Sequence, residues 1–283
     1  MARQTARSGA GARRTRSRRP RLTSRTADRY DLYQRSVQEP EADVRFVRRI
    51  FRNRYGRDPR VLREDFCGTA AICCQWVRSH RENRAIGVDL DPEPLDWGRR
   101  HNLAPLRPEQ RDRVELLRGD VRRVARRADV ICAFNFSYYC FKTREELHRY
   151  FAAARRSLGR EGLLVLDAYG GPQAQERMAE PRDCGGFDYV WDQDLFDPIS
   201  HETRCYIHFE FRDGSALRRA FSYDWRLWTL PEIRELLREA GFRESEVYWE
   251  GTDRATNEPN GVYTRRRRAP DDPAWIAYLV GIP

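Results

Sequence analysis

The sequence has no apolar run long enough to cross a bilayer, and it is nearly without lysine. A membrane-spanning helix needs about 20 consecutive apolar residues, and no run in the 283 residues approaches that length. Lys142 is the only lysine beside many arginines, a bias from which no function follows. With 40% hydrophobic residues the chain can bury one large core. We therefore expect a soluble protein that makes no membrane contact.

Cysteine pairs at the spacing of metal or redox sites are also missing. None of the seven cysteines forms a C-x-x-C pair, and several lie in apolar runs. This distribution is typical of small buried side chains in a reducing compartment, and it argues against a zinc site or a disulfide framework. We therefore expect a cytoplasmic protein without a bound metal.

Acidic residues are absent from the first 25 positions. Residues 1–25 hold nine arginines, and removing these from the net charge of +10 leaves about +1 for the rest of the chain. The segment has too few large apolar residues to offset the entropy of ordering, so we expect it to be disordered. A solvated tail, a weak contact with nucleic acid and a transit peptide all remain open for it.

Residues 60–98 form the most informative segment. An apolar start at Val61 and Leu62 runs into a turn of small residues at 64–70, and a second apolar run at 85–88 ends on Asp89. This carboxylate follows the turn by about twenty residues, where doubly wound nucleotide-binding folds place an acid for the ribose. The pattern predicts a parallel α/β sheet that holds an adenosine-containing cofactor.

The turn has too few glycines for a pyrophosphate. A dinucleotide site has the pattern G-x-G-x-x-G, whereas this turn has one glycine, Gly68, between Phe66 and Ala70. It suits a ligand without phosphate that needs only close approach to the backbone at residues 67–69. S-adenosylmethionine (SAM) is such a ligand.

On these residues the chain resembles the class I SAM-dependent methyltransferases. Five segments match the motifs of that family in order: residues 64–70, 87–91, 118–121, 129–138 and 162–167. Phe66 and Ala70 stand where the family usually has glycine. The resemblance covers about residues 30–251 and implies a Rossmann-like fold, with a doubly wound, mostly parallel sheet of seven strands.

The resemblance also implies which residues meet the cofactor. Asp89 corresponds to the ribose ligand and Asp120 to the residue that binds the adenine amino group. The full expected set is Tyr33, Glu64, Phe66, Cys67, Gly68, Thr69, Asp89, Leu90, Asp120, Val121, Asn135 and Phe136.

Residues 26–283 are expected to form one methyltransferase domain with two additions. Helical spacing at about 28–57 predicts helices that cover the cofactor as a lid or pack as ordinary helices. Alternating patterns at 187–196, 205–211 and 217–223, with a turn at Asp213-Gly214, predict a small antiparallel insertion at about 170–226 over the active site. Strands are expected at 247–249 and 261–264, and an apolar end at 275–280 that docks onto the domain.

The chemistry requires alignment of methyl group and acceptor, and in some cases a general base. Asp167 ends the fifth expected strand and is the preferred base, with His148, His201 and Tyr169 as alternatives. Tyr138 and Tyr139 are expected to orient an acceptor. Aromatic residues of the insertion would roof the acceptor pocket or fill the insertion's own core: Tyr189, Trp191, Phe209, Phe211, Tyr223 and Trp225.

The sequence therefore predicts transfer of a methyl group from SAM to a nitrogen or oxygen atom of a small-molecule acceptor. Two alternatives remain: an enzyme acting on RNA or protein, and a SAM-fold binding module that its arginine-rich tail recruits to nucleic acid. Nothing in the sequence indicates an oligomeric state.

Overall fold

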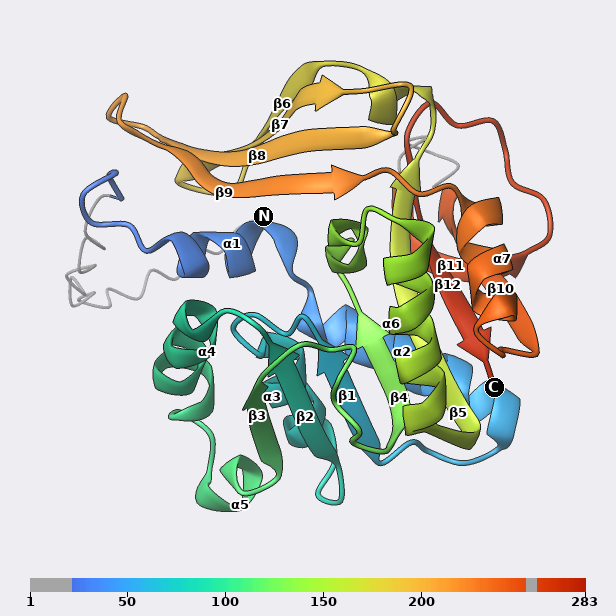
Figure 1. Cartoon of the computed structure of the whole chain (residues 1–283). Coiled ribbons are helices and arrows are strands. Elements are labelled where there is room, and N and C mark those ends of the chain that lie inside the picture. Colours follow the sequence, from blue (N-terminus) through green and yellow to red (C-terminus); the bar gives the residue numbers. More distant parts are fainter. Residues whose placement is uncertain (1–21, 253–258) are drawn as a thin grey trace, which may run out of the picture.

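The computed structural model describes residues 22–252 and 259–283. Within these ranges the main sheet has eight strands in the order β11-β10-β12-β5-β4-β1-β2-β3 (Figure 1). The strands from β5 to β3 in this order pair in parallel. The three pairings at the other end of the sheet, β11 with β10, β10 with β12 and β12 with β5, are antiparallel. The bounds are β1 Val61–Asp65, β2 Arg84–Asp89, β3 Val114–Arg118, β4 Ala128–Ala133, β5 Leu158–Gly170, β10 Glu244–Thr252, β11 Pro259–Arg266 and β12 Trp275–Ile282.

Helices cover both faces of this sheet. Apolar side chains of α2 and α3 pack on one face, and those of α6 and α7 pack on the other. The bounds are α1 Arg29–Val37, α2 Pro40–Tyr55, α3 Ala71–Ser79, α4 Pro92–Gly98, η1 Arg99–Leu103, α5 Pro108–Arg111, η2 Ser137–Cys140, α6 Arg144–Ser157, η3 Pro172–Gln175 and α7 Leu230–Glu239. None of the helices in the described ranges has the length and apolar character to span a membrane.

The sheet has one strand more than the seven expected. Residues 275–282 do not simply dock on the domain, because they form β12 between β5 and β10, antiparallel to both. Ala277, Leu279 and Ile282 have no exposed surface. A strand buried on both faces has a continuous apolar pattern, which periodicity alone does not distinguish from a packed tail.

The insertion forms a separate antiparallel sheet in the order β6-β7-β8-β9. Its bounds are β6 Met178–Asp183, β7 Phe187–Phe196, β8 Glu202–Phe211 and β9 Ala216–Arg226. Strand β6 precedes the three segments whose alternating patterns predicted the insertion. Leu32 of α1 packs against Phe187, Ile207 and Phe209 of this sheet. Helix α1 therefore lies between the small sheet and the carboxyl ends of the parallel strands (Figure 1).

The last four residues of the expected tail, residues 22–25, have a defined place in the structure. Residues 1–21 lie outside the described residues. Leu22 packs against the apolar cluster of the small sheet, and the Ser24 amide donates to Ser215 Oγ at 3.0 Å. These contacts anchor the segment that leads into α1.

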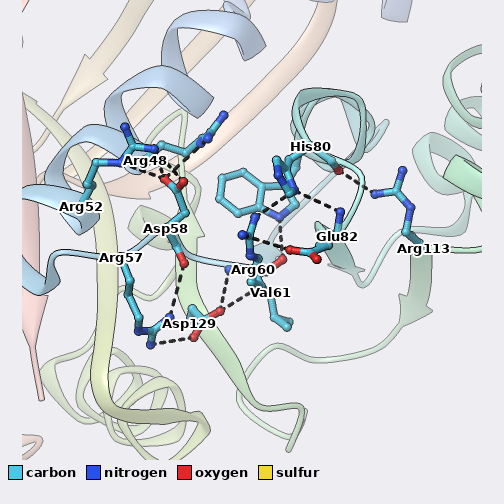
Figure 2. A network of polar contacts seen from close by, with 11 residues as sticks. Arg48, Arg52, Arg57, Asp58, Arg60, Val61, His80, Glu82, Arg113 and Asp129 are labelled. Atoms are coloured by element: carbon cyan, nitrogen blue, oxygen red, sulfur yellow. Dashed lines mark hydrogen bonds and ion pairs between the residues drawn. The ribbon is translucent and has the colours of Figure 1, made fainter.

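A polar network fixes the amino-terminal edge of the parallel strands (Figure 2). One Asp129 oxygen accepts the backbone amides of Arg60 and Val61 at 2.7 and 2.9 Å, which joins the beginnings of β1 and β4. Arg57 forms an ion pair with the same carboxylate at 3.3 Å. The network lies at the edge opposite to the strand ends where ligands bind in such sheets, so its role is structural.

A fully buried ion pair supports the last residues of β1. Arg63 and Asp65 have side chains without exposed surface and are joined by a two-point contact at 2.8 and 2.9 Å. Tyr150 of α6 donates to the same Asp65 carboxylate at 3.1 Å. Because every polar group of this cluster has a partner, it holds the end of β1 against α6.

Candidate functional site

The turn after β1 has an unusual backbone. Phe66, Gly68 and Ala70 all have positive φ angles, of 59°, 52° and 58°. Such angles are uncommon for residues other than glycine, so two of the three positions are strained. Backbone hydrogen bonds hold the turn, from the Cys67 amide to the Val88 carbonyl at 2.9 Å and from the Ala70 amide to the Cys67 carbonyl at 2.8 Å.

Asp89 lies at the end of β2, facing this turn. One carboxylate oxygen accepts the Gly68 amide at 2.7 Å, and the other accepts the Asp91 amide at 2.9 Å. Burial raises the pKa of Asp89, although these amides act in the opposite direction. Each oxygen keeps a lone pair for a further donor, such as a sugar hydroxyl.

Glu64 lies deeper, at the end of β1. Its side chain is buried, and Oε2 accepts the Cys73 amide near the start of α3 at 3.1 Å. Burial raises the pKa of Glu64 to about 8. A cationic group of a ligand placed here would favour the ionised carboxylate.

A cavity of about 400 Å³ opens over the turn, and we name it the cofactor cavity. Eight of the residues expected to meet the cofactor line it: Tyr33, Glu64, Phe66, Cys67, Gly68, Thr69, Asp89 and Asn135. The opposite wall comes from β9, through residues 219–223. A methyl group built on Gly68 would meet nothing within 4 Å, so the backbone there faces open space. The carboxylates of Glu64 and Asp89, together with an accessible turn that has one glycine, fit a nucleoside without a pyrophosphate.

Four residues expected at the cofactor lie outside the lining of this cavity: Leu90, Asp120, Val121 and Phe136, the last of which lines a neighbouring cavity. Asp120 forms a two-point ion pair with Arg122, at 2.8 to 3.1 Å, in a surface cleft beside α6. This pairing lowers the pKa of Asp120. Val121 is buried in the core, and Leu90 is exposed over 69% of its surface. Arg122 thus takes up part of the hydrogen-bonding capacity of Asp120 that an adenine amino group would use.

Helix α1 covers the cofactor cavity from one side. Gln34 donates to Thr69 Oγ1 at 3.1 Å, which ties the helix to the turn. Trp97 of α4 donates to Asp28, the residue that caps α1, at 2.8 Å. Arg29 adds an exposed ion pair with Glu93. These contacts place the helix where a lid would lie.

The turn after β4 is built around Asp167. The Asp167 carboxylate accepts the backbone amides of Asn135 and Phe136 at 2.7 and 2.9 Å. Both of these residues have positive φ angles, of 56° and 57°. Burial raises the pKa of Asp167 to about 7. The carboxylate therefore stabilises a strained turn at the junction of the cavities, a contact that sequence reasoning missed.

Tyr138 and Tyr139 lie in the core and line none of the cavities described here. Neither has exposed surface. The Tyr138 hydroxyl donates to the Asp167 carbonyl at 2.7 Å, and the Tyr139 hydroxyl donates to the carbonyls of Tyr169 and Trp228 at 3.4 Å. Both hydroxyls form hydrogen bonds with backbone carbonyls in the core. The structure therefore does not place them where they could orient a methyl acceptor. The alternative bases His148 and His201 do not line the cofactor cavity either.

A second cavity, of about 810 Å³, lies between the two sheets, and we name it the aromatic cavity. It meets the cofactor cavity at Tyr33, Asn135 and Tyr223, which line both. Its walls carry the rings of Phe136, Tyr169, Tyr189, Trp191, Trp225, Trp249 and Trp275. Of the six aromatic residues proposed for the pocket roof, Phe209 and Phe211 instead fill the core of the small sheet.

Two tryptophan residues that line the aromatic cavity were not expected there from the sequence. Trp249 of β10 and Trp275 of β12 lie with ring centroids 5.0 Å apart. They reach the cavity because β12 is inserted into the sheet, a pairing that no local pattern indicates.

A groove of about 1270 Å³ continues from the aromatic cavity along α2 and β11. Asp43 and Tyr278 lie in it, with the Tyr278 hydroxyl donating to Asp43 at 3.0 Å. Burial raises the pKa of Asp43 to about 6. Carboxylates outnumber arginines in this groove, which lowers its affinity for anionic groups.

Comparisons with known proteins agree with this geometry. Residues 65–166 match the family model described as a methyltransferase domain. The fold is similar to that of a SAM-dependent methyltransferase from Clostridium acetobutylicum, with 18% identity, a TM-score of 0.61 and coverage of 89% of this chain and 97% of that one. At the level of sequence, no curated protein matches the chain.

Two further solved structures are similar in fold. A sugar N-methyltransferase from Streptoalloteichus shares 21% identity over 100% of this chain and 98% of that one, with a TM-score of 0.59. An amino pentose methyltransferase from Micromonospora echinaspora, solved with SAM bound, shares 17% identity over 91% and 98%, with a TM-score of 0.61.

Proposed function

We propose that the chain binds SAM and methylates an amine nitrogen of a small-molecule acceptor, as the match of residues 65–166 to a methyltransferase domain supports. One observation carries this proposal: the cofactor cavity and the aromatic cavity meet at Tyr33, Asn135 and Tyr223. A methyl donor in the first cavity and an acceptor in the second would therefore come together at these three side chains. A volume of about 810 Å³ suits a small molecule.

Nitrogen is favoured over oxygen by the lining of the aromatic cavity. Aromatic faces attract a cationic amine, and Glu180, Glu250 and Asp272 contribute carboxylates against the single arginine Arg182. That arginine donates to the Ser36 carbonyl and stacks over Tyr189, so it is not free to bind an anion. The printed descriptions of two similar structures, a sugar N-methyltransferase and an amino pentose methyltransferase, support the same choice.

Bound SAM supplies an electrophilic methyl group on a positively charged sulfur. Asp89 would hold the ribose hydroxyls, and Glu64 would face the cationic end of the cofactor. Gln38 lines the same cavity and has a buried Oε1 with no hydrogen-bond partner among the described residues, so it can accept a donor there. The rings of Tyr33 and Tyr223 would exclude water from the junction.

An amine must lose its proton before it can attack a methyl group. Asp167 lines the adjoining groove and binds the amide of Asn135, a junction residue, and its pKa of about 7 allows it to take a proton near neutral pH. It would do so while it accepts the amides of Asn135 and Phe136. Tyr138 and Tyr139 would act on the reaction only through the packing beneath this turn.

The test is a product assay with a panel of amino sugars and their hydroxyl analogues. Mass spectrometry of products would locate the methyl group on nitrogen or on oxygen. Trp191→Ala should raise the KM for the acceptor and leave SAM binding unchanged, because Trp191 lines only the acceptor side. Ile199→Ala, at an exposed loop of the same insertion, is the matched control. Methylation of hydroxyl groups alone would contradict the proposal.

A further inference from the structure

His208 lies at an irregular place in the small sheet. It belongs to β8 and is only 6% exposed. The pairing of β8 with β9 shifts between Ile207, opposite Phe221, and Phe209, opposite Leu217. Three residues of β9, 218–220, therefore lie opposite the single residue His208. Such a bulge bends a strand and redirects its side chains, and here Arg219 adopts a positive φ of 50°.

Both ring nitrogens of His208 are in use. Nδ1 accepts the backbone amide of Arg219 at 2.7 Å, and Nε2 lies 3.0 Å from an Asp192 oxygen on β7. A backbone amide can only donate, so Nδ1 carries no proton and Nε2 donates to Asp192. The contacts thus select one neutral tautomer, which links three strands of the sheet.

The stretch of β9 that begins within the bulge is a wall of the cofactor cavity. Residues 219–223 line it opposite Gly68 and Asp89. The same stretch contacts α1, because Arg29 donates to the Ala220 carbonyl at 3.5 Å and the Phe221 ring lies 4.9 Å from that of Tyr33. The shape of the bulge therefore sets the position of this wall and of the helix that covers the cavity.

We propose that neutral His208 is a positioning residue that holds the β9 bulge in the shape that closes the cofactor cavity around SAM. A proton on Nδ1 would face the Arg219 amide and break this hydrogen bond. Asp192 on β7 faces the ring, and the Arg219 side chain of β9 stacks over Tyr206 of β8, whose ring centroid lies 6.1 Å from that of His208. Asp192 can pair with the neutral or the protonated ring. Protonation of Nδ1 therefore keeps the contact with Asp192 and loses the hydrogen bond that holds the β9 wall.

The test measures the affinity for S-adenosylhomocysteine by calorimetry between about pH 5 and 8. His208→Asn places an oxygen near the position of Nδ1 and does not titrate. His208→Gln reaches the position of Nε2 and lacks the acceptor for Arg219. The wild-type affinity should fall by about threefold to tenfold toward the acid end, the effect of one lost hydrogen bond. The Asn variant should lack this part of the pH dependence, and the Gln variant should bind weakly throughout.

Equal pH dependence of the wild type and the Asn variant, or wild-type affinity in the Gln variant, would overturn the proposal. Glu64 and Asp167 titrate in all three proteins, so only the differences between them report on His208. The tautomer is checked independently by the nitrogen chemical shifts of the ring, which is practical because the chain has five histidines. A protonated Nδ1 at neutral pH would also overturn it. No acceptor is needed, so the outcome is separate from the choice of methylated atom.

Discussion

The carboxylate of Asp89 accepts the backbone amide of Gly68 at 2.7 Å. This contact joins the end of β2 to the turn after β1, across the mouth of the cofactor cavity. The sequence separates the two residues by a helix and a strand, yet the fold brings them together at one edge of the sheet. The same carboxylate is the one that the motif pattern assigned to the ribose of a cofactor.

Asp89→Ala should weaken SAM binding at least tenfold. The variant removes a charged acceptor from the ribose position and leaves the Gly68 amide without its partner, each of which costs about 1 kcal/mol or more. Isothermal titration calorimetry measures the change. Asp96→Ala is the control, because Asp96 is exposed and forms a surface ion pair with Arg99. Equal affinities in the two variants would remove Asp89 from the site.

Gly98→Ala should displace the turn and weaken SAM binding. A methyl group at this position would lie 2.3 Å from the Thr69 carbonyl oxygen, which is far inside van der Waals contact. Gly159→Ala is matched to it, since a methyl group there meets nothing within 4 Å. Thermal unfolding should show a lower Tm for the first variant only. Normal SAM binding by Gly98→Ala would mean that this close approach does not position the turn.

Tyr138→Phe should affect stability rather than catalysis. The variant leaves the Asp167 carbonyl without its buried donor, so the free energy of unfolding should fall by about 1–3 kcal/mol. Urea denaturation measures this change, and calorimetry should find SAM affinity unaltered. A large loss of methyl transfer at full stability would instead support the catalytic role that the sequence suggested for this residue.

Three buried carboxyl groups should make the free protein less stable as the pH rises. Burial raises the pKa values of Asp43, Asp167 and Glu64 to about 6, 7 and 8. The folded state therefore binds more protons than the unfolded chain, and stability present below about pH 4 is lost as the pH rises toward 8. Urea denaturation at several pH values tests this, and Glu64→Gln should flatten the upper part of the curve. Stability that rises across this range would contradict it.

The parallel half of the fold was predictable because its signals are local. Two short apolar runs, at Val61-Leu62 and at 85–88, predict strands. The turn that follows the first run has a recognisable motif of small residues. The antiparallel strands of the main sheet were harder to predict. Residues 275–282 show an apolar run, but their place between β5 and β10 depends on pairings with residues far away in sequence.

The candidate site divides in the same way. Gly68 and Asp89 were found because motif spacing and sheet geometry agree. Asp167 was found as a carboxylate at a strand end, but its hydrogen bonds to the turn after β4 depend on strained φ angles that no composition reveals. Asp120 was found because it matched its motif. Its ion pair with Arg122 could not be predicted, because it depends on the conformations of the two side chains.

The most direct test of the account is titration of the purified protein with SAM, S-adenosylhomocysteine and NAD. Asp89, which we propose holds a ribose, lines the cavity over Gly68, and the turn there has one glycine. We therefore expect micromolar binding of the first two ligands and none of NAD. Binding of NAD, or of none of the three, would contradict the account.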